Sequence, residues 1–161
     1  MAARKALKPL WTCPKCGARL VSRNLWHSCG RFRLEALFAG ADPGALKLAR
    51  KIMAAVKSLG DVQCIPQKTR LVFVARVRFA GMVPRKDHVI LTFALHRRLR
   101  SKRVERHIDY GPRWQAHQVR VRSTEDIDRE LRGWLQESYG VVGLQSDLGA
   151  PRKQTRRSVS P

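Results

Sequence analysis

The sequence predicts an α+β protein: an N-terminal zinc-binding hairpin, then a helix, an antiparallel β-meander and a C-terminal helix. Three observations lead to this prediction. Three cysteines and one histidine gather within residues 11–30, apolar residues recur at helical spacing within 42–60 and 123–140, and apolar and polar residues alternate in the segments between. Because each helix has one apolar stripe, we expect both helices to pack on one face of the sheet.

The cysteine-rich segment has the pattern C-x2-C-x10-H-x-C, formed by Cys13, Cys16, His27 and Cys29. These donors suit one tetrahedral Zn²⁺ ion, and four protein ligands close its coordination shell, which predicts a structural metal. A C-x-x-C redox pair is the alternative, but it requires neither His27 nor Cys29. The two-residue spacing of His27 and Cys29 does not fit one face of a helix, so we expect no base-reading helix in this module.

The elements after this module follow from periodicity and capping residues. Asp42 and Pro43 predict the start of a helix that ends near Gly60. Ser123 and Asp126 form a capping-box pattern that opens the second helix. Between the helices, the alternation predicts strands at 62–66, 71–79, 88–96, 103–110 and 116–122.

The chain is strongly basic, with 33 Lys and Arg residues against 12 Asp and Glu residues among 161, a net charge of +21. A basic head at 1–10 and a basic tail at 145–161, which we expect to be disordered, contribute +3 each and leave +15 for the rest. The 11–30 module and the α+β domain at 42–140 therefore carry most of the positive charge. Such a charge favours nucleic acid, either RNA or DNA, as the partner.

The sequence contains no apolar run long enough to span a membrane, and residues 1–11 lack the apolar stretch of a signal peptide. We therefore expect a cytoplasmic protein with no membrane partner, in a compartment that keeps thiols reduced and able to bind metal. Cys64 lies outside the motif and is expected to be a small buried apolar residue.

Basic residues fall on the strand face opposite the apolar positions and in the loops at its ends, where they can contact phosphates. In a meander, the loops 80–87 and 111–115 share one end of the sheet, and the loops 67–70 and 97–102 share the other. Aromatic residues that stack bases are missing from this face, and Trp114 either joins the first loop pair or fills the end of the core. The predicted nucleic-acid-binding residues are Arg76, Arg78, Arg85, Lys86, Arg103, Arg113, Arg120 and Arg122.

Two alternative functions stay open at this point. A metal-independent nuclease would use three histidines on predicted strands for acid–base catalysis, namely His88, His96 and His107. An adaptor that docks an acidic protein would use three basic residues around the zinc motif, namely Lys15, Arg19 and Arg23. The sequence has no paired carboxylates, nucleophile motif or phosphate-binding loop, so no catalytic residue is assigned.

The chain resembles a family of small bacterial α/β domains of uncharacterised function. Four segments carry this resemblance: WTCPKCG…HSCG, VFVARVRFAG, PRKDHVILTF and YGPRWQAHQVRVRSTEDIDRELRGWLQESY. Some members of that family carry the label "predicted transport protein", and the zinc motif often precedes the domain. The resemblance spans about residues 11–140 and implies a small α/β domain behind a zinc site, with no catalytic residues to transfer.

Overall fold

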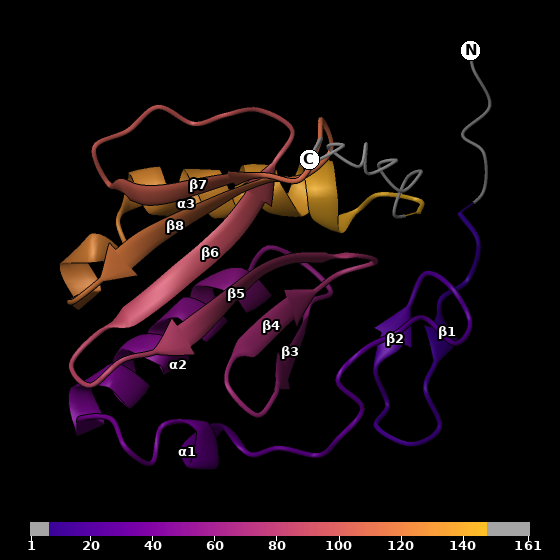
Figure 1. The fold of residues 1–161 in the computed structure, drawn as a ribbon, viewed down its shortest axis with the longest axis horizontal. Helices are drawn as coiled ribbons and strands as arrows, with labels where there is room; N and C mark the ends of the chain where they lie inside the picture. Colours follow the sequence, from indigo (N-terminus) through magenta and orange to yellow (C-terminus); the bar gives the residue numbers. More distant parts are fainter. Residues whose placement is uncertain (1–6, 148–161) are drawn as a thin grey trace, which may run out of the picture.

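A small hairpin precedes a larger mixed domain, and together they confirm the α+β class (Figure 1). The computed structural model describes residues 7–147 of the chain. The hairpin pairs β1 (Trp11–Thr12) with β2 (Arg19–Leu20). The domain is built on a six-stranded antiparallel sheet in the order β3-β4-β5-β6-β8-β7.

The bounds of the remaining elements are as follows. The strands of the sheet are β3 (Gln63–Pro66), β4 (Leu71–Val74), β5 (Arg78–Pro84), β6 (Val89–Leu95), β7 (Val104–Asp109) and β8 (Gln115–Val121). The helices are α1 (Leu34–Leu37), α2 (Pro43–Lys57), the 3-10 turn η1 (Thr124–Asp126), α3 (Arg129–Ser138) and the π-helical turn η2 (Tyr139–Gly143).

The helices α2 and α3 both pack on one face of the sheet, as their apolar stripes predict (Figure 1). Ile52 of α2 and Leu131 of α3 are fully buried in the same core as Leu91 and Phe93 of the central strand β6. Burying a side chain of this size contributes about 1.5–3 kcal/mol. The helix-covered face therefore holds the domain together, and the opposite face is called the open face below.

The segment predicted as one strand at 71–79 is instead a hairpin of β4 and β5, with Val74 opposite Arg78. The chain reverses through residues 75–77. The carbonyl of Gly143 accepts hydrogen bonds from the backbone N–H groups of Arg76 and Val77, at 2.8 and 3.0 Å, so the C-terminal segment holds this turn. The single-strand prediction is wrong because the alternation of apolar and polar residues continues through a turn without Gly, Pro or Asn.

The last two strands depart from the order of a simple meander. β8 lies between β6 and β7 and is antiparallel to both, with Leu95 opposite Gln115, so β6 and β7 run parallel. Residues 96–103 therefore cross over beside α3 to reach the start of β7. Leu99 anchors this crossover, because its side chain joins the core and its N–H donates to Nε2 of the buried His117 at 2.9 Å.

Both predicted helix starts are present, although the second is divided. α2 begins at Pro43, directly after Asp42 in the N-cap position. The capping box of Ser123 and Asp126 is formed, but it opens the short η1. Asp128 then starts α3 by accepting a hydrogen bond from the backbone N–H of Leu131 at 2.9 Å.

The predicted basic head and tail lie partly outside the described residues, which exclude 1–6 and 148–161. The first residues of the predicted tail pack on the loop between β7 and β8. Arg113 donates to the side chains of Gln145 at 2.6 Å and Asp147 at 3.2 Å. Within the described part of the chain, no helix combines the length and apolarity needed to cross a membrane.

The hairpin module docks on the open face at the β3 edge of the sheet. Arg19 forms a two-pronged ion pair with Asp61, at 2.8 and 2.9 Å, and its backbone N–H donates to the Gln63 side chain at 3.0 Å. Val72 and Val74, which point to the open face, are almost fully buried next to the module. The module thus lies along the β3 edge of the open face and leaves the part of that face over β5, β6 and β8 exposed (Figure 1).

Candidate functional site

The four predicted metal ligands come together at one point of the module. The sulfur atoms of Cys13, Cys16 and Cys29 and a ring nitrogen of His27 all lie within 4.8 Å of one another. Cys13 Sγ is 3.8 Å from Cys29 Sγ, and Cys16 Sγ is 3.3 Å from His27 Nε2. Tetrahedral zinc with Zn–S bonds of about 2.3 Å would place two sulfurs about 3.8 Å apart, so the donor set fits such a metal.

A tight turn presents the first two ligands. The backbone N–H of Gly17 donates to the carbonyl of Cys13, and the N–H of Cys13 donates to the carbonyl of Ala18, both at 2.8 Å. Gly17 has a φ of 77°, a conformation that glycine adopts at little cost. The other two ligands, His27 and Cys29, lie in a segment without helix or strand, as their spacing predicts.

Hydrogen bonds orient the ligands. Nδ1 of His27 donates to the carbonyl of Leu25 at 2.7 Å, which leaves Nε2 free to coordinate. A hydrogen bond from the Cys16 backbone N–H is the main cause that lowers the pKa of Cys13 to about 6. Desolvation, followed by the neighbouring thiols, raises the pKa of Cys29 to about 11. A cation at this point would therefore stabilise the thiolate form of Cys29 as well.

The exposed part of the open face, over β5, β6 and β8, forms a second candidate site, which we call the basic groove. It has a volume of about 900 Å³ and is lined by Arg70, Arg78, Arg85, Tyr110, Trp114, Thr92 and Gln118, among others. Its floor is hollow because the strands carry Gly81, Ala94 and Ala116 there. A Cβ atom at Gly81 would lie 2.8 Å from the carbonyl oxygen of Leu71 on the paired strand β4, so only glycine fits at this position of β5.

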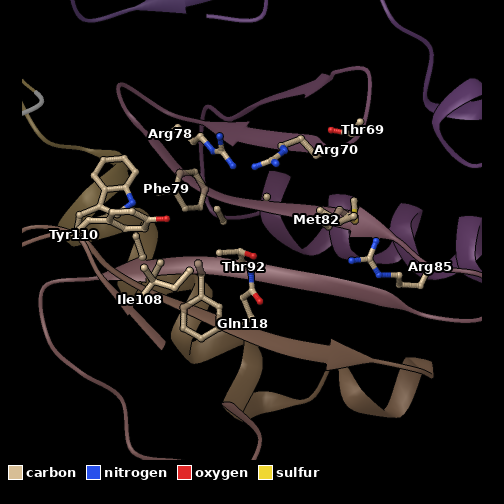
Figure 2. A pocket seen from close by; sticks show the side chains of 17 residues that line it. Thr69, Arg70, Arg78, Phe79, Met82, Arg85, Thr92, Ile108, Tyr110 and Gln118 are labelled. Atoms are coloured by element: carbon tan, nitrogen blue, oxygen red, sulfur yellow. The ribbon is translucent and has the colours of Figure 1, made fainter. Parts of the chain in front are cut away.

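Arg70 and Arg78 form the most distinctive feature of the groove. Figure 2 shows their guanidinium groups pointing toward one another, with Arg85 farther along the groove. Neither Arg70 nor Arg78 has an ion pair or a side-chain hydrogen bond to another residue among those described. Although Arg78 is open to solvent, the groove walls desolvate it, and this burial followed by repulsion from Arg70 lowers its pKa. Arg78 stays cationic at neutral pH, because arginine does not lose its proton in proteins.

Other predicted nucleic-acid-binding residues are engaged within the protein. Arg103 lies beside α3 rather than on the open face, where it pairs with Asp128 and Glu130 at 2.9 and 3.0 Å. The remaining engaged residues are Arg120, which pairs with Glu105, Arg113, which pairs with Asp147, and Arg76, which donates to the carbonyls of Gln145 and Lys8. These arginines have partners that a phosphate would have to displace.

The expected clustering of the loops is wrong. Because β8 is antiparallel to β6, the loop that holds Arg113 lies at the end of the sheet opposite to Arg85 and Lys86. Of the second expected loop pair, Arg70 reaches the basic groove, whereas residues 97–102 belong to the crossover beside α3. Arg122 lies near Asp87, at the same end as Lys86, outside the groove lining.

The structure also places aromatic side chains that the sequence did not locate on this face. Tyr110 and Trp114, from the end of β7 and the following loop, line the basic groove. Trp26, whose exposed fraction is 90%, lines a cleft between the module and the sheet. This cleft shares Arg70, Arg78 and Trp114 with the groove, so the two hollows adjoin.

The three histidines of the nuclease alternative are dispersed. His88 and His96 flank opposite ends of β6, which are roughly 20 Å apart for a seven-residue strand. His107 contacts Gln115 at 2.6 Å and stacks near the buried His117. Among the adaptor residues, Arg19 is used to dock the module, while Lys15 and Arg23 are exposed. Cys64 is half-buried against the core, and burial raises its pKa.

Comparison with protein families gives one match. A family model described as a domain of unknown function, DUF5655, matches residues 34–142. Comparisons with curated proteins and with solved structures give no match. The matched residues run from α1 into η2, so they include the sheet, both long helices and the basic groove, and they exclude the metal ligands. Since this match spans more than half of the sequence, the chain belongs to the DUF5655 family of domains of unknown function.

Proposed function

We propose that this protein binds nucleic acid through phosphate contacts on the open face of its sheet. The observation that carries the proposal is the pair Arg70 and Arg78, which face one another in a groove and have no carboxylate partner among the described residues. Two like charges held together this way repel each other, and a phosphate between them would relieve that repulsion and accept hydrogen bonds from both. The net charge of +21 supplies long-range attraction to the same kind of partner.

We also propose that the module holds one Zn²⁺ ion in a structural role. Four protein donors leave no coordination position for substrate, and thiolates with one imidazole suit zinc better than harder cations. The ion would fix residues 11–30, and through Arg19 and Gly17 it would fix the wall that the module builds beside the groove. A compartment that keeps thiols reduced, such as the cytoplasm, suits this centre.

The test is to measure how strongly the full chain binds fluorescent oligonucleotides, single-stranded and duplex, between 50 and 200 mM salt. Each phosphate contact releases counterions, so log Kd should rise linearly with log salt concentration. Changing Arg70 and Arg78 together to Gln should lower the affinity and reduce this salt slope by up to about two.

The matched control removes the same charge from the far side of the protein. Lys47 and Lys51 are exposed on α2, away from the groove, and changing both to Gln should leave most of the affinity and slope in place. Equal losses in the two double variants would mean that only net charge matters. Absence of binding to any oligonucleotide at 50 mM salt would refute the proposed function itself.

A further inference from the structure

The basic groove and the adjoining cleft combine cationic and aromatic side chains along one path. Arg70 and Arg78 line both hollows. Tyr110 lines the groove alone, Trp26 lines the cleft alone, and Trp114 lines both. Aromatic faces stack on nucleic-acid bases of any sequence, but only on bases that are not already stacked in a duplex.

The exposure of Trp26 is difficult to explain by packing. Its exposed fraction is 90%, the largest among the exposed large apolar side chains of the described residues, and it lies in sequence between the candidate metal ligands Cys16 and His27. The neighbouring His27 is one of those ligands. Because this ring also lines a cleft beside two arginines, it is suited to stack on a ligand bound there.

The floor of the groove is suited to a flat polar ring. Gly81, Ala94 and Ala116 leave room above the strands. Thr92 and Gln118 also line the groove, and neither side chain has a hydrogen-bond partner among the described residues. A hydroxyl and a carboxamide can address the donors and acceptors on the edge of an unpaired base.

We infer that this path binds a single strand of nucleic acid, with a phosphate held between Arg70 and Arg78, one base stacked on Trp26 and another entering the basic groove. The inference rests on the proposed function and narrows its ligand from nucleic acid in general to unpaired strands. A duplex keeps its bases stacked inside and presents phosphates on a convex surface, whereas Arg70 and Arg78 lie in a recess beside the module. The sequence predicts no base-stacking aromatic residues on this face. The three rings beside it come instead from other segments: Trp26 from the module, and Tyr110 and Trp114 from the loop after β7.

The experiment compares a labelled 12-nucleotide single strand with a duplex of the same length, using the full-length protein with zinc bound. We expect the single strand to bind at least about tenfold more tightly. Trp26→Ala should weaken single-strand binding about five- to 150-fold, the range for loss of one base–aromatic stack, and leave duplex binding unchanged. Trp26→Phe, which keeps an aromatic face, should restore most of the affinity.

Phe32→Ala is the matched control, because Phe32 is an exposed aromatic residue of the same region that lines neither hollow. It should bind both oligonucleotides like the wild type. If the duplex binds as tightly as the single strand and Trp26→Ala has no effect, the single-strand inference fails while the proposed phosphate binding stands. If a free mononucleotide binds as tightly as the 12-mer, the ligand is a nucleotide rather than a strand, and the inference also fails. If no oligonucleotide binds, the proposed function fails first.

Discussion

The two faces of the sheet are covered in different ways. On one face, α2 and α3 bury residues such as Leu91 and Leu131 in a continuous apolar core. On the other face, a small module that carries four candidate metal ligands lies only along the β3 edge, and the groove beside it stays open. The first covering is a continuous apolar core, whereas the second combines four candidate metal donors, a few polar contacts and a small apolar contact that includes Val72 and Val74.

Arginines differ between the same two regions. Arg97 and Arg103, beside α3, pair with carboxylates at 2.9–3.0 Å, and Arg103 also lies over the ring of Trp134. Arg70 and Arg78, on the open face, face each other without such partners. The difference separates arginines that stabilise the fold from arginines that are available to a ligand, although all four carry the same charge.

Removing one metal ligand should have the largest effect and should be confined to the open face. We expect Cys16→Ala to reduce bound zinc from one ion per chain to none and to abolish amide protection through residues 11–30. The helix-covered core should keep its protection. Metal analysis together with hydrogen exchange would measure both. The control is Cys64→Ala, which leaves the four donors intact and should retain the metal. Unfolding of the whole chain in Cys16→Ala would contradict the prediction that the helix-covered core is stable without the module.

Two neighbouring residues on β6 test the difference between the faces directly. Leu91 is fully buried under the helices, whereas Thr92 lines the open groove. Leu91→Ala should lower the free energy of unfolding by about 2–5 kcal/mol, because it leaves a cavity in the core. Thr92→Ala should change it by less than about 0.5 kcal/mol. Urea denaturation of both variants would decide the matter, and equal losses would show that the open face also carries the fold.

The comparison of the arginines predicts a smaller effect on stability. Replacing Arg103 should affect stability but not binding, and replacing Arg78 should affect binding but not stability. Arg103→Gln removes two ion pairs and a ring contact, so it should lower the free energy of unfolding by about 1 kcal/mol and leave oligonucleotide affinity unchanged. Arg78→Gln should leave stability unchanged within about 0.5 kcal/mol, because it relieves repulsion from Arg70, and should weaken binding. A loss of stability in Arg78→Gln equal to that in Arg103→Gln would contradict this distinction.

The smallest expected effect concerns pH. The hydrogen bond from Arg97 lowers the pKa of Glu137 below its ordinary value, so the pair stabilises the fold when Glu137 is ionised and loses its effect as the pH falls through that pKa. The destabilisation caused by Arg97→Gln, about 0.3–0.5 kcal/mol at pH 7, should therefore vanish between about pH 5 and pH 3. Thermal unfolding across that window would measure it. The stability difference caused by Arg78→Gln should not follow this titration, since no described carboxylate pairs with Arg78.

Much of the fold follows from local patterns. The spacing of the metal ligands, the start of α2 at Pro43 and the alternation along β6 are each set by residues close in sequence. The hairpin turn at 75–77 and the position of β8 in the sheet are not set by residues close in sequence. The turn is held by Gly143, and the crossover is held by Leu99 on His117, so both depend on contacts between segments far apart in the chain.

The candidate sites divide in the same way. The metal centre could be predicted because cysteine and histidine at this spacing have few other uses. The groove and the adjoining cleft could not be predicted, because Arg70, Trp26 and Tyr110 come from three separate segments. Of the predicted basic residues, Arg103 and Arg120 look no different in sequence from Arg78, and only the positions of Glu105, Asp128 and Glu130 separate them.

The edge position of β7 has a consequence for how the sheet is completed in time. β7 has one neighbour in the sheet, β8, which comes after it in the chain. As the chain is synthesised from its N-terminus, residues 104–109 therefore emerge before the strand they pair with. β8 must also pair with β6, from which residues 96–114 separate it in the chain. Pairing of segments that are far apart in sequence is slow. β7 can therefore take its place in the sheet only after residue 121 has been made.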